Sequence, residues 1–219
     1  MNWDCEKNEE QKLRNPWETI PLEDYENHMR LDSVMQLQTM NAAMKTQFNQ
    51  YPVGSIMILG IAGGNGLEHI DPEKIRRVYG IDINETYLEE CESRFPALKE
   101  TLICRCVDLT AEGNILPHAD LLVANLLIEY IGYPCFVRIM RQVKPRYLSC
   151  IIQINPEEHF VSESPYESVF RDLNRVHHQM EEQGLKEAAA EAGYCFREKE
   201  EYPLPNGKKL VRMEFQIKK

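Results

Sequence analysis

The sequence predicts an α/β fold: a three-layer sandwich in which helices cover both faces of a seven-strand, mostly parallel sheet. Three observations lead to this prediction. Short apolar runs alternate with segments of helical character. The first run ends in a glycine-rich loop. Two alternating strands around an Asn-Gly turn close the chain, which predicts an antiparallel C-terminal hairpin.

The composition suits one globular domain with an accessory segment. The chain has 219 residues, 43% of them hydrophobic, and a domain commonly takes about 100–200 residues. No apolar stretch approaches the roughly 18 residues of a membrane helix, and the N-terminus lacks the basic-then-apolar pattern of a secretory signal. The seven scattered cysteines suit a reducing compartment. We therefore expect a cytoplasmic protein that does not act at a membrane.

The charge argues against general nucleic-acid binding. The net charge is −10, whereas a general binder of polyanions presents a basic face. A local basic cluster (138–146) is typical of a solvated helix end. The sequence leaves open whether the chain forms a homodimer.

The first 50 residues form the predicted accessory segment. Residues 1–20 are polar and show no period, which indicates an arm. Between Leu31 and Phe48, apolar residues recur every three or four positions, which predicts one amphipathic helix capped by Asp32 or Ser33. Tyr51-Pro52 ends it. The main domain is therefore predicted over 51–219.

Seven strands are predicted in that domain. Five apolar runs separated by helical segments indicate a parallel sheet buried on both faces. The last two strands alternate and flank the turn at Asn206-Gly207. The predicted strands are Ser55–Ile61, Arg77–Ile83, Thr101–Val107, Ala119–Leu126, Tyr147–Ile154, Tyr194–Tyr202 and Lys209–Ile217.

The glycine-rich loop Gly60–Gly66 follows the first strand. Glycines let the backbone turn sharply and let a ligand lie against bare peptide. We expect a helix after this loop, with its N-terminal amides directed at the ligand. By itself, such a loop occurs in many nucleotide-binding folds.

Polar residues end the next three strands. Asp82 ends the second strand and can reach both hydroxyls of a ribose. Asp108 ends the third, where it can accept from an adenine amino group, and Asn125 ends the fourth. Ligands of open α/β sheets bind at this carboxyl edge. Individually, Asp82 and Asp108 are equally consistent with capping the helices that follow.

In these features the chain resembles the class I S-adenosylmethionine (SAM)-dependent methyltransferases, which have a Rossmann-like fold, over roughly residues 55–217. The resemblance implies transfer of a methyl group from SAM, with S-adenosylhomocysteine (SAH) as the product. It implies that Asp82 binds the ribose and that Ile83 lies against the adenine. The other implied cofactor residues are Gly60, Ala62 and Gly64 at the methionine moiety, Asp108 and Leu109 at the adenine edge, and Asn125 at the amino group. The family usually has Asp or Glu at the position of Ile58, which helps to organise the ammonium end of SAM.

Two other classes of function stay open. One is a member of the fold that binds SAM without catalysis, or binds nothing. The other is an NAD(P)-dependent oxidoreductase, because Gly60, Gly63 and Gly66 have a G-x-x-G-x-x-G spacing. Against it, the loop does not read G-x-G-x-x-G, no Tyr-x-x-x-Lys pair occurs, and the terminal hairpin favours methyl transfer.

The acceptor is expected to be a small molecule, and O, N, S and C acceptors all stay open. The segment after Asn125 lacks the Asn/Asp-Pro-Pro-Tyr typical of amide and adenine N-methylating enzymes. It resembles half of the acidic loop of protein arginine methyltransferases, but Arg138 stands near the position of the second glutamate. Glu129 and Tyr130 are candidates to face the acceptor, and solvation of Glu129 and helix packing by Tyr130 are the alternatives.

Two segments are candidates to cover the site. Related enzymes carry a lid where the N-terminal segment lies, and Tyr25 and His28 are its best polar contacts. An insertion at about 155–180 corresponds to the substrate wall of small-molecule methyltransferases, with Asn155, Tyr166 and His178 as candidates. His178 is the candidate base, although a helix-surface histidine is the common alternative. Cys104-x-Cys106 lacks further ligands, so we predict no metal site.

Overall fold

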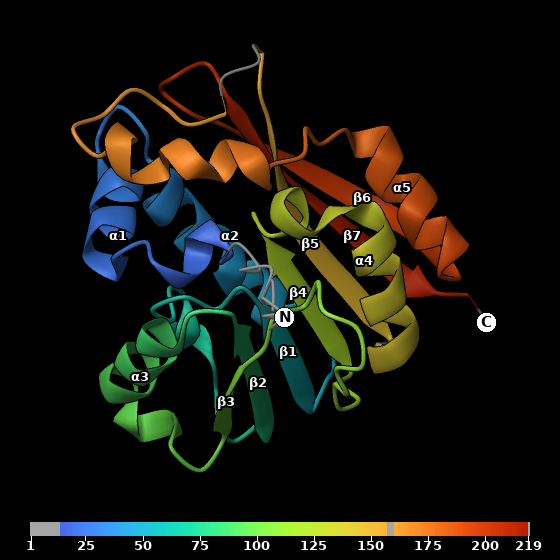
Figure 1. The fold of residues 1–219 in the computed structure, drawn as a ribbon. Coiled ribbons are helices and arrows are strands. Elements are labelled where there is room, and N and C mark those ends of the chain that lie inside the picture. Colours follow the sequence, from blue (N-terminus) through green and yellow to red (C-terminus); the bar gives the residue numbers. More distant parts are fainter. Residues whose placement is uncertain (1–13, 157–159, 219) are drawn as a thin grey trace, which may run out of the picture.

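The computed structural model describes residues 14–156 and 160–218, which fold into a seven-strand sheet with helices on both faces (Figure 1). The fold expected from the sequence is confirmed. The strands are β1 (Ser55–Leu59), β2 (Arg77–Asp82), β3 (Leu102–Cys106), β4 (Leu121–Asn125), β5 (Tyr147–Ile154), β6 (Tyr194–Pro203) and β7 (Lys209–Ile217). The α-helices are α1 (Leu22–Arg30), α2 (Gln36–Asn49), α3 (Glu85–Arg94), α4 (Ile128–Val143) and α5 (Glu182–Glu191).

The strand order is β3-β2-β1-β4-β5-β7-β6. Strands β1 to β5 pair in parallel, whereas β7 pairs antiparallel with both β5 and β6. The order reverses direction at β1 and β4, which pair Ile58 with Val123. Such a switch point leaves a crevice beyond the carboxyl ends of the two strands, so the topology itself places a ligand site there.

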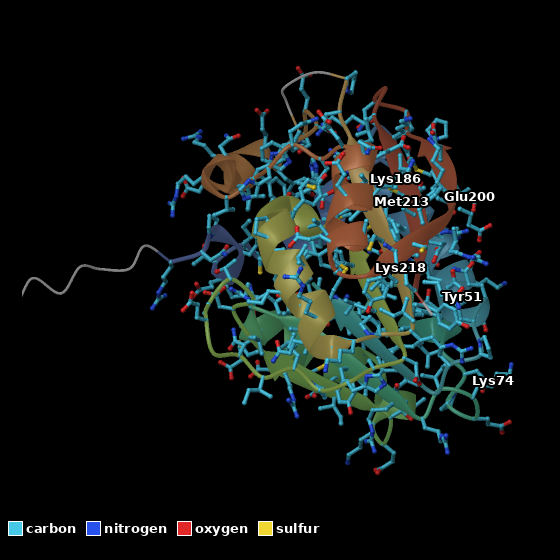
Figure 2. The ribbon with its side chains drawn as sticks, turned by 90° about the vertical axis from the view of Figure 1, so that its right-hand side faces the viewer. Tyr51, Lys74, Lys186, Glu200, Met213 and Lys218 are labelled. Atoms are coloured by element: carbon cyan, nitrogen blue, oxygen red, sulfur yellow. The ribbon has the colours of Figure 1, made fainter. Side chains whose placement is uncertain are left out.

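Two hydrophobic clusters fill the spaces between the three layers. One cluster joins α4 and α5 to one face of the sheet and includes Phe136 and Leu185. The other joins α2 and α3 to the opposite face and includes Phe48 and Leu88. Figure 2, which views the molecule turned by 90°, shows Lys186 of α5 and Tyr51, just beyond α2, well apart across β7.

The N-terminal segment differs from the single helix expected over 31–48. It forms α1, then a turn, then α2, and α2 begins at Gln36. Met35 adopts a left-handed conformation with φ of 54°, and neither Asp32 nor Ser33 caps the helix. The apolar period continued through the turn because residues on both sides of it face the same core, so periodicity alone could not locate the break.

The segments between strands carry fewer helices than expected. A short 3-10 turn (Leu67–His69) stands between β1 and β2, where the sequence predicted a helix after the glycine loop. Among the described residues, the β3–β4 connection is irregular as well. Within the described parts of the chain, no helix has the length and apolar character needed to cross a bilayer.

Candidate functional site

The glycine loop begins as a tight turn at the tip of β1. The Gly60 and Ile61 amides both donate to the Ile81 carbonyl, at 2.8 and 3.2 Å. Gly60 has a φ of +69°, and a Cβ there would lie 3.1 Å from the Leu127 side chain. A side chain at Gly60 would therefore strain the backbone and crowd the start of α4. Since no α-helix follows the loop, its ligand surface is bare loop backbone rather than a helix N-terminus.

Asp82 lies at the tip of β2 with its carboxylate held by loop amides. Oδ2 accepts from Ala62 N at 2.9 Å, and Oδ1 accepts from Asn84 N at 3.0 Å. Burial raises the pKa of Asp82, and the backbone hydrogen bonds oppose that shift. Each carboxylate oxygen can accept a second hydrogen bond, so a ligand with two donors can bind here without displacing the loop.

The capping alternative for the two aspartates does not hold. Asn84, not Asp82, caps α3, because its side chain accepts from the Thr86 and Tyr87 amides. Asp108 accepts from the Thr110 amide at 2.9 Å within a turn, and the described residues between it and β4 contain no α-helix. Both carboxylates remain at the carboxyl edge of the sheet.

The tips of β1 to β4 surround one cavity of about 650 Å³, part of which is open to solvent. Every cofactor residue expected from the sequence lines it except Gly64. A Cβ on Gly64 would instead meet Phe95 and Cys91, so Gly64 lies against α3. The lining expected from the sequence consists of Gly60, Ala62, Asp82, Ile83, Asp108, Leu109 and Asn125.

The N-terminal segment covers this cavity. Trp17 and Tyr25 line it, and their rings make an edge contact at 5.4 Å between centroids. Two hydrogen bonds attach the segment to the domain beneath: Tyr87 donates to the Ile20 carbonyl at 2.8 Å, and Asn84 donates to the Trp17 carbonyl at 2.9 Å. Sequence reasoning singled out Tyr25 but not Trp17, whose position depends on these long-range bonds.

An ion pair also joins α1 to α3 across the glycine loop. Glu26 on α1 accepts from Arg94 Nη1 at 2.5 Å, and its side chain is 12% exposed. Both side chains lie over Gly63, where a Cβ would come within 2.6 Å of each. Gly63 thus gives this pair room to cross the loop.

A second cavity, which we call the inner pocket, lies beneath the lid and encloses about 540 Å³, some of it solvent. It meets the first cavity at four residues that line both, namely Trp17, Tyr25, Leu126 and Tyr130. Its remaining lining comes from α1, the start of α2, α4, β5 and the segment after β5. That lining consists of His28, Met29, Gln36, Glu129, Gln153, Phe160, Val161, Phe170, Leu173 and His177.

Glu129 is the buried acid of the inner pocket. Its side chain is 3% exposed, and Oε1 accepts from Gln153 N at 2.9 Å. Burial raises the pKa of Glu129 to about 7. Of the two sequence alternatives, solvation of Glu129 is therefore excluded by its burial.

The histidines lie differently from the expectation. His177 lines the inner pocket, with its ring stacked on Phe160 at 3.6 Å between centroids. The His178 ring lies near Gly132, and its backbone amide donates to the Glu129 carbonyl at 2.7 Å. His178 lines neither cavity. Because the two histidines are adjacent, the sequence could not tell which ring faces inward.

Of the three other residues predicted in the covering segments, one lines the inner pocket and two line neither cavity. His28 lines the inner pocket, and its Nδ1 lies 2.7 Å from Ser164 Oγ. Asn155 and Tyr166 line neither cavity: Asn155 contacts Gln153 and Gln179, and Tyr166 packs in the cluster beneath the lid. Residues 14–156 and 160–218 contain no group of three His, Cys, Asp or Glu side chains placed to bind a metal.

Comparison with known proteins gives matches at the level of structure. No protein-family model and no curated protein matches the chain. A SAM-dependent methyltransferase of Leishmania major is similar with a TM-score of 0.65 and 11% identity, covering 91% of this chain and 80% of that one. Magnesium protoporphyrin IX methyltransferase from Synechocystis, solved with bound SAM, gives 0.58 and 11%, covering 88% and 83%.

A protein with a different printed activity shares the architecture. The [4+2]-cyclase SpnF matches with a TM-score of 0.63 and 10% identity, covering 86% of this chain and 84% of that one. At these identities the likenesses establish the fold, which is that of the class I SAM-dependent methyltransferases. The reaction must be argued from the site itself.

Proposed function

We propose that the protein binds SAM in the first cavity and transfers its methyl group to a small-molecule acceptor. The observation that carries the proposal is the convergence of four strand tips on one cavity, with the Asp82 carboxylate fixed by the Ala62 and Asn84 amides. The structural neighbours described as SAM-dependent methyltransferases support it through the fold.

The lining fits the parts of SAM. The Asp82 oxygens keep acceptor capacity for two ribose hydroxyls, and Ile83 and Leu109 offer apolar contact on either side of an adenine ring. Gly60 and Ala62 present bare or nearly bare backbone to the methionine moiety. SAM supplies an activated methyl group on a sulfonium, so the protein's task is to align the acceptor and exclude water.

The acid that the family usually places at Ile58 has a replacement in this chain. Ile58 is buried, 3% exposed, in the α2–α3 face of the core. Glu26 from the lid lies in the same cleft of the glycine loop as Ile58, Gly60 and Gly63. We assign to Glu26 the task of organising the ammonium end of SAM, with Arg94 holding its carboxylate in place.

The domain division follows from these roles. Residues 1–50 act as the lid, within which 1–13 lie outside the described residues. Residues 51–219 form the SAM-binding domain, and the segment at about 155–180 provides one wall of the inner pocket through Phe160, Phe170 and His177. A reducing compartment such as the cytoplasm suits the described cysteines, which carry free thiols.

Calorimetric titration with SAH, and with NADH for comparison, tests the proposal. Before the titration, a sample of the purified protein is denatured, and the released material is checked by mass spectrometry for a co-purified ligand. The titrations use folded protein from which any such ligand has been removed. Binding of SAH alone supports SAM use, whereas binding of NADH alone overturns it in favour of an oxidoreductase. If neither binds to ligand-free protein, the chain is a member of the fold that does not use SAM.

A further inference from the structure

The inner pocket contains two buried polar atoms that lack a partner within the protein. Glu129 Oε2 and Trp17 Nε1 each have no hydrogen-bond partner among the described residues. A buried polar group left without a partner costs about 1–3 kcal/mol. Of the two, Glu129 lines the inner pocket alone, so its unpartnered oxygen points to a polar ligand that donates a hydrogen bond there.

The charge of the pocket wall favours a cation. Glu129 is the sole acidic residue of the described lining, and no lysine or arginine lines the pocket. Burial, with a contribution from Lys208, lowers the pKa of His28 to about 4. Burial likewise lowers the pKa of His177 to about 4, helped by His178 and Lys208. Both imidazoles are therefore neutral at pH 7 and can accept hydrogen bonds.

Lys208, whose charge acts on both histidines, already has hydrogen-bond partners. Lys208 Nζ donates to the Phe160 carbonyl at 2.6 Å and lies 3.3 Å from Ser162 Oγ. Lys208 is not part of the lining. A carboxylate or phosphate ligand would thus meet Glu129 without a neutralising partner, and such an arrangement is unfavourable away from water.

Aromatic rings complete the wall. Trp17 and Tyr130 meet edge to face with ring centroids 5.0 Å apart, next to Tyr25. The ring centroids of Phe170 and His28, which also line the pocket, lie 4.9 Å apart. The face of an aromatic ring attracts a cation, most strongly where water is excluded. A carboxylate surrounded by such rings is a site for a small organic ammonium ion.

We propose that the inner pocket is the acceptor site and that it selects a small primary or secondary amine, held as its ammonium form by Glu129. This inference rests on the proposed function. It places the amine beside Tyr25 and Tyr130, which line both cavities. The amine nitrogen in the inner pocket is therefore next to the cavity that we assign to SAM.

Methyl transfer to the amine releases one proton. The ammonium gives one proton to the Glu129 carboxylate, and the freed nitrogen lone pair forms the N–C bond to the methyl group. The S–CH3 bond breaks, its electron pair stays on sulfur, and SAH leaves as a neutral thioether. The product is the methylated ammonium ion, and Glu129 returns its proton to solvent.

Three probes matched in shape test the selection. Benzylamine, benzyl alcohol and benzoate are titrated at pH 7 into the full chain saturated with SAH. The same titrations are run on Glu129→Gln and on Glu23→Gln, an exposed lid carboxylate that changes the net charge equally. SAH affinity and circular dichroism of each variant are measured in parallel. Incubation with SAM, followed by mass spectrometry, adds a test for N-methylbenzylamine.

We expect benzylamine to bind at least about tenfold more tightly than the other probes, a difference of 1.4 kcal/mol. In Glu129→Gln the preference should fall to within about twofold while SAH affinity holds, and Glu23→Gln should keep it. Equal or tighter binding of benzyl alcohol or benzoate, or binding of none of the three, overturns the amine site. The wild-type comparison decides this even if Glu129→Gln does not fold. Failure of SAH to bind at all refutes the proposed function instead.

Discussion

The side-chain amides of Gln47 and Asn125 donate to each other, with Nε2–Oδ1 and Nδ2–Oε1 distances of 3.0 and 2.9 Å. Gln47 is fully buried on α2, and its amide also donates to Ser149 Oγ at 2.8 Å. Ser149 in turn donates to Glu214 at 2.7 Å. A buried polar network therefore connects α2 with β4, β5 and β7 and fixes the tip of β4 at the first cavity.

Gln47→Met tests this network. Methionine keeps the volume but removes every hydrogen bond, which leaves the Asn125 amide unsatisfied. We expect the free energy of unfolding to fall by about 1–3 kcal/mol, measured by urea denaturation, together with weaker SAH binding. Gln183→Met is the matched control, because Gln183 is exposed on α5. An unfolding free energy equal to that of the control would show that the network carries no stability.

Asp82→Ala tests the ribose assignment. The change removes the carboxylate that orients Ala62 and Asn84 and that the proposal pairs with the ribose hydroxyls. We expect SAH affinity to fall at least about tenfold, because charge-assisted hydrogen bonds contribute about 1.5–3 kcal/mol. Calorimetry measures the affinity, and thermal unfolding checks the fold. Asp71→Ala, at a more exposed carboxylate that also accepts a backbone amide, should leave it unchanged. A loss below about threefold for Asp82→Ala would remove the ribose role.

The sequence carried enough information to predict the sheet and most of the cofactor cavity. β5 and β7 have the predicted bounds, and Asp82 and Asn125 end their strands as expected; Asp108 lies two residues beyond the end of β3 and still lines the cavity. These features are local: apolar runs define strands, and residues at strand ends meet at one edge of a parallel sheet.

The rest depended on contacts between distant segments. Trp17 lines the cavity because Asn84, 67 residues further along the chain, donates a hydrogen bond to the Trp17 carbonyl. The choice between His177 and His178 is made by a bond to the Glu129 backbone. The packing of the glycine loop is long-range as well: a Cβ on Gly66, at φ of +87°, would lie 2.9 Å from Met44, so α2 packs closely against this loop.

Substitution of each partner tests whether the Glu26–Arg94 ion pair contributes to SAH binding. Arg94→Gln should release the Glu26 carboxylate from the ion pair that joins α1 to α3 across the glycine loop, while Glu26→Gln should remove the charge that we propose faces the ammonium end of SAM. Arg94 is the more exposed partner, at 36%, and an ion pair open to solvent contributes about 0.2–1 kcal/mol. We therefore expect Arg94→Gln to weaken SAH binding up to about fivefold and Glu26→Gln to weaken it more.

The relative size of the two losses of SAH affinity distinguishes a contact within the lid from a contact with the ligand. Calorimetry at low and high salt measures both variants. Arg30→Gln is the control, because Arg30 approaches Glu26 only to 3.9 Å and is 56% exposed. Equal losses of SAH affinity in the two variants would mean that Glu26 acts only by holding the lid in place. If neither variant loses affinity, Glu26 is not part of the SAM site.

The buried carboxyl group of Glu129 makes the free energy of unfolding depend on pH. Its pKa is raised to about 7 by burial, from 4.5 in the unfolded chain. Between these values the folded state holds a proton that the unfolded state has released, so the free energy of unfolding falls as pH rises. The contribution is fully present below about pH 4.5 and lost above about pH 7. The titratable groups around it are Tyr25, Tyr130, Tyr133, Cys150, His28 and His177.

Comparison with Glu129→Gln isolates this contribution, because the other groups are common to both proteins and cancel in the difference. The variant should gain stability relative to wild type by up to about 3 kcal/mol between pH 4.5 and pH 8, measured by urea unfolding at both pH values. Glu23→Gln should show a small difference that is the same at both. A constant difference for Glu129→Gln would place its carboxylate in contact with water. Addition of benzylamine at pH 8 should narrow the gap, because a bound ammonium stabilises the wild-type carboxylate and has no such partner in the variant.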